Sequence, residues 1–156
     1  MKVDIKQFDE IRLAVIEHRG DPKLIVKSIN KLISWAKAQS INLKPKPGNA
    51  FAIAYDDPKI TPAVEFREDL GIKVPENLKL DGDVIEKYLP SGRYATVMHK
   101  GLRENNIADT VYYLYREWLP KSGEQLGDFP CVFAYYNFPH EVAETELLTE
   151  CRLLLK

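Results

Sequence analysis

A nine-residue segment occurs twice in this chain of 156 residues, at a spacing of 81 residues. Residues 12–20 align with residues 93–101, and four of the nine positions are identical. A repeat at a fixed spacing indicates architecture, and two copies are too few for a solenoid. We therefore predict one domain, residues 1–156, built from two similar halves at about residues 1–76 and 82–156, with a cleft along a pseudo-twofold axis. The same spacing pairs Tyr55 with Tyr136, Pro58 with Pro139, Glu65 with Glu146 and Asp69 with Glu150.

Composition excludes several classes of protein. The formal net charge of −1 gives no electrostatic footprint for nucleic acid or for an anionic membrane surface. The N-terminus lacks an apolar signal core, and no run approaches the roughly 18 apolar residues of a membrane span. A cytoplasmic protein is therefore expected. Cys131 and Cys151 are too few for a disulfide scaffold and are expected to be buried thiols.

The first half is predicted to be strand, helix, strand, strand. Residues 11–17 alternate between apolar and polar, as in a half-buried strand. Gly20, Asp21 and Pro22 then supply a stop, an N-cap and a first-turn proline for a helix. Its apolar stripe comprises Ile25, Ile29, Leu32, Ile33 and Ala36. A loop at 44–49 and strands at 51–55 and 63–74 complete this half.

The second half repeats this order. Its helix, capped by Asn105 or Asn106 and ended by Gly123, has apolar residues at helical spacing. These residues are Ile107, Val111, Leu114, Tyr115, Trp118 and Leu119. Strands are predicted at 84–88, 93–98, 131–136 and 145–155. The predicted fold class is α+β, with a mainly antiparallel sheet and two helices on one face.

Several motifs, in this order and spacing, resemble one family. Each His-Lys/Arg-Gly strand end is followed by a helix with a late tryptophan, Trp35 or Trp118. The turn at 55–62, the strand entry at 90–95 and the terminal strand at 149–154 add further matches. Together they resemble the gyrase-inhibitor-like (GyrI-like) small-molecule-binding domain, which is also the effector-binding domain of some AraC-type and MerR-type multidrug regulators. Because no helix-turn-helix is found, the chain resembles the stand-alone members, which include bacterial DNA gyrase inhibitors.

The resemblance implies a groove between the two helices and a buried acid on the last strand that receives cationic, often aromatic, ligands. By motif position this acid is Glu150, whose partner in the other half is Asp69. A buried carboxylate is costly unless it is paired, and aromatic faces attract cations by about 0.5–2 kcal/mol each. The candidate aromatic residues of the site are Tyr55, Phe66, Tyr113, Trp118, Phe133 and Tyr136.

Other interpretations compete with this one. Strand alternation puts Glu150 and Arg152 on one face, which favours either a solvated face or neutralisation of Glu150 by Arg152. Trp118 fits core packing, since it lies in its helix's apolar stripe. His18 and His99 occupy equivalent strand ends, which indicates a structural role. With His140 as the third histidine, no metal-ligand spacing occurs, and we expect no metal and no cofactor.

The leading hypothesis is a non-enzymatic binding protein for small, largely apolar, cationic aromatic molecules, without direct contact to nucleic acid or membrane. A second hypothesis is contact with DNA gyrase. A third is a hydrolase of reactive electrophiles, in which Glu150 activates water beside a tyrosine. The chain lacks a Gly-x-Ser-x-Gly elbow, a phosphate loop and a dinucleotide motif, and catalytic residues are therefore not assigned. The ligand's identity and the oligomeric state stay open.

Overall fold

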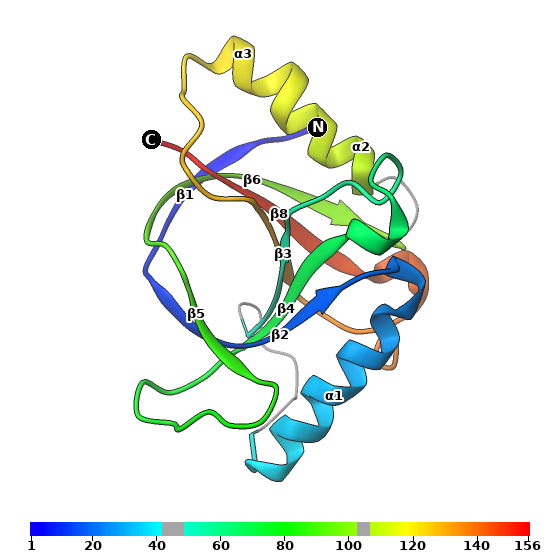
Figure 1. Ribbon diagram of the computed structural model, residues 1–156. Helices are drawn as coiled ribbons and strands as arrows, with labels where there is room; N and C mark the ends of the chain where they lie inside the picture. Colours follow the sequence, from blue (N-terminus) through cyan, green and yellow to red (C-terminus); the bar gives the residue numbers. More distant parts are fainter. Residues whose placement is uncertain (42–48, 103–106) are drawn as a thin grey trace.

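The computed structural model describes residues 1–41, 49–102 and 107–156. Within these residues the strands form one antiparallel sheet of eight strands, in the order β1-β6-β8-β7-β3-β4-β2-β5 (Figure 1). The strands are β1 (Asp4–Phe8), β2 (Ile11–Arg19), β3 (Ala50–Ala54), β4 (Arg67–Lys73), β5 (Ile85–Leu89), β6 (Gly92–Lys100), β7 (Cys131–Tyr135) and β8 (Leu148–Leu154). The helical elements are η1 (Pro22–Leu24), α1 (Ile25–Ala38), η2 (Ala63–Glu65), α2 (Ile107–Tyr112), η3 (Tyr113–Trp118), α3 (Leu119–Ser122) and η4 (Glu144–Glu146). The α+β prediction is confirmed.

Strand pairings in the two halves correspond at the spacing of the sequence repeat. Ala52 lies opposite Phe133, its own counterpart 81 residues on, at the middle of the β3–β7 pair. Likewise, the pair Asp4 and Thr96 between β1 and β6 recurs as Ile85 and Val15 between β5 and β2. Each half therefore gives its first strand to the other half. The sequence prediction missed β1 and this exchange.

Both helices lie on the same face of the sheet. α1 buries Leu32 and Ala36 in a core cluster that includes Ala14 of β2. α2 and η3 cover the cluster around Ala95 of β6 and Leu114, and residue 95 is the counterpart of residue 14. The apolar stripe of α1 is only partly buried, because two of its members, Ile29 and Ile33, stay exposed.

The second helix runs from α2 through the π-helical segment η3 into α3 (Figure 1). Gly123 ends it in the left-handed conformation, with φ 77°, as the sequence predicts. The proposed caps Asn105 and Asn106, and residues 44–48 of the predicted loop, lie outside the described residues. Among the described residues, no helix is long and apolar enough to cross a membrane.

Two predicted strands are too long. A 3-10 turn, in which the Glu65 N–H donates to the Pro62 carbonyl at 2.9 Å, precedes β4. The equivalent turn, with Glu146 donating to Ala143 at 2.8 Å, precedes β8. The strands therefore begin a few residues later than the predicted positions 63 and 145, because each chain segment first turns the corner from the preceding loop.

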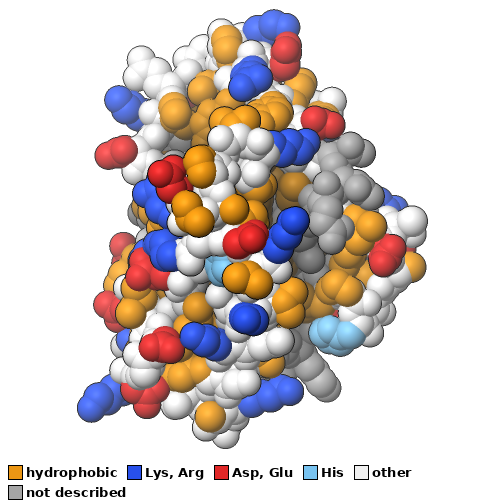
Figure 2. Space-filling view, turned by 45° about the vertical axis from the view of Figure 1, so that its right-hand side comes forward, with side chains coloured by type: hydrophobic (Ala, Val, Ile, Leu, Met, Phe, Trp, Pro, Cys, Tyr) orange, Lys and Arg blue, Asp and Glu red, His pale blue; other side chains and the backbone are white. Residues whose placement is uncertain are grey.

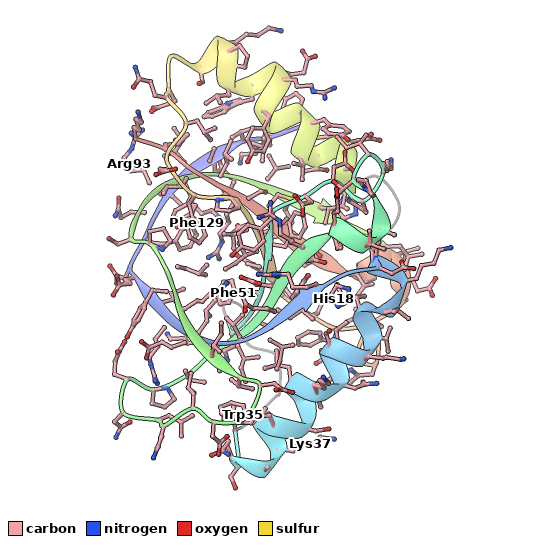
Figure 3. All side chains as sticks on the ribbon, in the orientation of Figure 1. His18, Trp35, Lys37, Phe51, Arg93 and Phe129 are labelled. Atoms are coloured by element: carbon pink, nitrogen blue, oxygen red, sulfur yellow. The ribbon has the colours of Figure 1, made fainter. Side chains whose placement is uncertain are left out.

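The face of the sheet away from the helices curls around a second core. Phe51 and Phe129 point into the space that the sheet encloses (Figure 3). The buried members of this inner core are Leu13, Val15, Phe51, Ile53, Leu89, Val132 and Ala134. The central strands are thus covered on both sides, by helices on one face and by the sheet's own curl on the other.

Candidate functional site

Glu150 lies on the inner face of β8, with 1% of its surface exposed. Its Oε1 accepts a hydrogen bond from Nε of Arg152 at 2.7 Å. Its Oε2 accepts one from Nζ of Lys6, on β1, also at 2.7 Å. Burial alone would raise the pKa of Glu150, but the hydrogen bonds from Lys6 and Arg152 outweigh it and hold that pKa below its usual value. Glu150 is therefore a buried carboxylate with a cation on each oxygen.

The interpretation of Glu150 and Arg152 as a solvated face is wrong. Both side chains alternate onto the same face, as predicted, but Arg152 is only 4% exposed. Its guanidinium lies 3.8 Å from the ring centroid of Phe8 and 5.6 Å from that of Phe51. The face is buried because the sheet curls over it. The predicted alternative, neutralisation of Glu150 by Arg152, is confirmed by their hydrogen bond.

Asp69, the counterpart of Glu150, is fully buried in a denser network on the same inner face. Tyr55 donates its hydroxyl to Oδ2 at 2.6 Å, and Lys87 donates to the same oxygen at 2.5 Å. Arg19 donates to Oδ1 at 2.9 Å. Lys87 is the counterpart of Lys6, so each half sends a lysine from its first strand to the acid of the other half. Tyr55 is thus held by Asp69, and the structure does not bring it to Glu150.

Tyr136 is the counterpart of Tyr55 and packs half-buried against the inner core. In the described part of the chain no hydrogen bond joins its hydroxyl to Glu150. The cavity on this inner face has a volume of about 10 Å³ and is lined by side chains that include Phe8, Tyr94 and Arg152. This volume has room for about one water molecule, so the inner face is closely packed around these side chains.

The helix-bearing face has a different character. α1 packs on β2 and β4 and α2 packs on β6, so β3 and β7 lie between the two helices. We call their helix-facing side chains the inter-helix strip, which consists of Ala50, Ala52, Ala54, Cys131, Phe133 and Tyr135. Phe133 is half-buried and contacts both the α1 cluster and the α2 cluster. On this face hydrophobic side chains alternate with charged ones (Figure 2).

The remaining predicted aromatic residues lie on or near this face. Phe66 is 4% exposed, and its ring centroid is 6.4 Å from that of His18. Trp118 packs against the α2 cluster, which agrees with its expected role in the core. Together with Tyr113 it lines a hollow of about 180 Å³ on the second helix, completed by Glu117, Lys121 and Ser122. The predicted residues therefore divide between two faces: Glu150, Tyr55 and Tyr136 on the inner one, and the others on the helix side.

Sequence reasoning missed a carboxylate on the helix side. Glu68 of β4 lies opposite His18 of β2 and opposite Ala54 of β3. It alternates with Leu70 and Ile72, which pack under α1, so its side chain shares their face. Burial, with a smaller contribution from the charge of Asp69, raises the pKa of Glu68 to about 7. A charged residue on the apolar side of an alternating strand was the signal that could have found it.

The histidines hold strand–helix corners. His18 Nε2 donates to the carbonyl of Asp21 at 2.9 Å, and its Nδ1 accepts from the Ser28 hydroxyl at 2.8 Å. His99 Nε2 donates to the carbonyl of Leu102 at 3.0 Å, which is the equivalent contact in the other half. Both cysteines are free and buried, and burial raises the pKa of Cys131 to about 12. Such thiols are poor nucleophiles at neutral pH.

The curled sheet, with two helices on one face and aromatic side chains between them, defines a small α+β ligand-binding domain. The chain belongs to the GyrI-like small molecule binding domain family, whose model matches residues 1–156. A relative from Escherichia coli K12, named probable transcriptional regulator YgiV, is 34% identical over 151 residues, covering 96% of this chain and 93% of the relative. A DNA gyrase inhibitor from Erwinia billingiae is 24% identical over 152 residues, covering 94% of each chain.

Solved structures share the fold at low sequence identity. The C-terminal domain of EcmrR superposes with a TM-score of 0.77 at 17% identity, covering 99% of this chain and 97% of that one. In the EcmrR–DNA complex the same match spans 57% of the EcmrR chain. SAV2435 bound to tetraphenylphosphonium superposes with a TM-score of 0.63 at 11% identity, covering 100% of this chain and 94% of that one.

Proposed function

We propose that this chain binds small, largely apolar, cationic aromatic molecules, and that they bind along the inter-helix strip. The observation that carries the proposal is the position of Phe133, half-buried at the centre of the sheet and in contact with the cores under both helices. An aromatic ligand on this strip would meet an aromatic ring flanked by the small side chains of β3. Small side chains let a ligand approach the sheet closely, and the ring attracts cationic character.

The inner face is less suited to such a ligand. Its cavity of about 10 Å³ admits no organic molecule, and both oxygens of Glu150 already carry cations. A ligand that reached Glu150 would have to displace Lys6, whose side chain is 42% exposed and can move into water. Glu150, Tyr55 and Tyr136 would then contribute to binding only after the edge strand β1 had opened.

Thermal-shift titration with tetraphenylphosphonium tests the proposal, with neutral triphenylphosphine oxide as the matched uncharged compound. A ligand that binds only the folded state raises the unfolding temperature with concentration. We expect a shift for the cation, a smaller one for the neutral compound, and loss of most of the shift in Phe133→Ala. Equal shifts for both compounds would contradict cation selectivity, and the absence of any shift across a panel of aromatic cations would refute the proposal.

Contact with DNA gyrase is a second candidate function, favoured by the relative of that name aligned along 94% of this chain. We expect such an interaction to be a contact with the gyrase protein, because the net charge of −1 does not favour binding to DNA. We also expect it to take place in the cytoplasm. Co-precipitation with purified gyrase, in the presence and absence of tetraphenylphosphonium, separates the two functions. If this chain binds gyrase but none of the tested cations, contact with gyrase would replace small-molecule binding as the proposed function.

A hydrolase reaction that uses Glu150 as general base receives less support. Hydrogen bonds from Lys6 and Arg152 hold the pKa of Glu150 below its usual value, against the effect of burial. A carboxylate with a lowered pKa is a weak base, and the best base has a pKa near the working pH. Turnover of an electrophile that is abolished in Glu150→Gln would overturn this view.

A further inference from the structure

Glu68 is a half-buried acid that, among the described residues, differs from the buried Asp69 and Glu150 in having no partner. In the part of the chain that the structure describes, no side chain donates a hydrogen bond to its carboxylate and no cation pairs with it. The Glu68 side chain is half-buried, so its carboxylate keeps some water but is partly desolvated, which disfavours the charged form. Asp69 and Glu150, by contrast, each have two cations in contact.

The position of Glu68 places it beside the inter-helix strip. Its register partner on β3 is Ala54, a member of the strip whose side chain is a single methyl group. Phe66, two residues earlier, is on the same side of the chain and contacts the ring of His18. Glu68 is also half-buried, so its carboxylate keeps some access to solvent.

We infer that Glu68 supplies the negative charge that an organic cation meets when it binds along the inter-helix strip. The inference rests on the proposed function and names the acidic residue that pairs with the charge of the ligand. A monovalent cation with an apolar body would pair with the carboxylate while its rings cover Phe133, and it would remove the cost of the unpaired charge. The second half has no such group, because the counterpart of Glu68 is Thr149.

Two other carboxylates are weaker candidates. Glu150 faces the interior of the curled sheet and is neutralised by Arg152 and Lys6. Glu117 lines the hollow on the second helix, but its side chain is 62% exposed, so water screens its attraction for a cation. Glu68 combines partial burial, the lack of a partner among the described residues, and a position beside the inter-helix strip at Ala54.

The test is isothermal titration of the full chain with tetraphenylphosphonium at pH 8, using wild type, Glu68→Gln, Glu150→Gln and Glu10→Gln. Glu10 lies exposed between β1 and β2 and controls for the loss of one negative charge. We expect Glu68→Gln to weaken binding at least about tenfold, and Glu10→Gln to change it less than about twofold. Urea unfolding of each variant verifies that it is folded.

The outcomes are separable. If binding in Glu68→Gln is as strong as in the wild type, the inference is overturned and the proposed function stands. If binding is lost only in Glu150→Gln, the inference is also overturned, and the acid that pairs with the ligand is Glu150 on the inner face. Absence of binding to the wild type overturns both.

A second measurement needs no variant. Tetraphenylphosphonium has a fixed charge, so its affinity for the wild type should fall as Glu68 is protonated, below pH 7, and should level off at the affinity of Glu68→Gln. His18 faces Glu68 from β2, Asp69 adjoins it on the same strand, and β3 contributes the apolar Ala54. Because other titratable groups lie this close, only a pH dependence that vanishes in Glu68→Gln assigns the effect to the Glu68 carboxylate. A flat profile between pH 5 and pH 8 would refute the inference.

Discussion

The two inner-face acids, Asp69 and Glu150, occupy equivalent positions but are neutralised differently. Both receive a lysine from the first strand of the other half. Asp69 gains its further contacts from Arg19, across the strand pair, and from the Tyr55 hydroxyl. Glu150 gains its second cation from its own strand, through Arg152. The lysine is common to both sites, while the other partners differ.

The difference follows from one position on the inner face. The counterpart of Arg152 is Gly71, whose neighbours crowd this position: a Cβ there would lie 3.0 Å from Cδ1 of Leu13, so that side chain would have to shift. Arg152 extends over Phe8 and toward Phe51, and Phe51 is the register partner of Gly71. Only one of the two equivalent positions can carry a large cation. Glu150, the buried acid on the last strand, therefore forms a buried ion cluster with Arg152 and Lys6 in this chain, in addition to any role with ligands.

The largest effect should come from removing the charge of each acid in turn. Glu150→Gln leaves Arg152, with a side chain 5% exposed, without its counter-charge, and we expect a loss of about 3 kcal/mol in the free energy of unfolding. Asp69→Asn should cost less, about 1–2 kcal/mol, because Lys87 and Arg19 are 26% and 40% exposed and can regain water. Urea denaturation at pH 7 measures both. Equal losses would mean that exposure of the remaining cations does not decide the cost.

Glu68 provides a third acid for the comparison, and the sign of its effect is opposite. Its pKa rises from 4.5 to about 7 in the folded state, so folded protein binds more protons than unfolded protein between these values. Stability should therefore fall as pH rises from about 4.5 to 7. Removing the charge should reverse this loss, and Glu68→Gln should be more stable than wild type by about 2 kcal/mol at pH 8, and equal to it near pH 4.5. Urea denaturation at the two pH values decides this, and a pH-independent difference would contradict it.

Strong local patterns predicted most of the fold. The repeated segment became β2 and β6, the Asp21 cap and Pro22 began the first helix, and Gly123 ended the second. β1 was missed because its residues are mostly exposed and its two apolar residues, Ile5 and Phe8, do not alternate along the strand. Its place beside β6 depends on a partner about 90 residues away, which strand periodicity does not encode.

The site was less accessible to sequence reasoning, for a physical reason. Alternation correctly put Glu150 and Arg152 on one face, but a period of two cannot distinguish a solvated face from one enclosed by the sheet's own curl. Lys6, which pairs with Glu150 from 144 residues away, could not be inferred. Glu68 could have been, since it interrupts the apolar side of a strand that is otherwise Phe66, Leu70 and Ile72.

The smallest effect should distinguish the two equivalent lysines, Lys87 in the Asp69 cluster and Lys6 in the Glu150 cluster. Lys87 bonds to Asp69 and also to Glu17, at 2.5 and 2.9 Å, whereas Lys6 bonds to Glu150 alone among the described carboxylates. Burial alone would lower the pKa of Lys87, but its hydrogen bonds to Asp69 and Glu17 outweigh burial and raise that pKa above its usual value. The fold therefore stabilises the charged form of Lys87 at pH 7. Lys87→Met should cost about 1.5 kcal/mol in unfolding free energy, and Lys6→Met about 0.5 kcal/mol, because the more exposed Lys6 gives up less on release to water. If Lys6→Met proved the costlier change, the edge strand β1 would depend on its ion pair more than on its hydrogen bonds to β6, and a ligand could not displace Lys6 cheaply from Glu150.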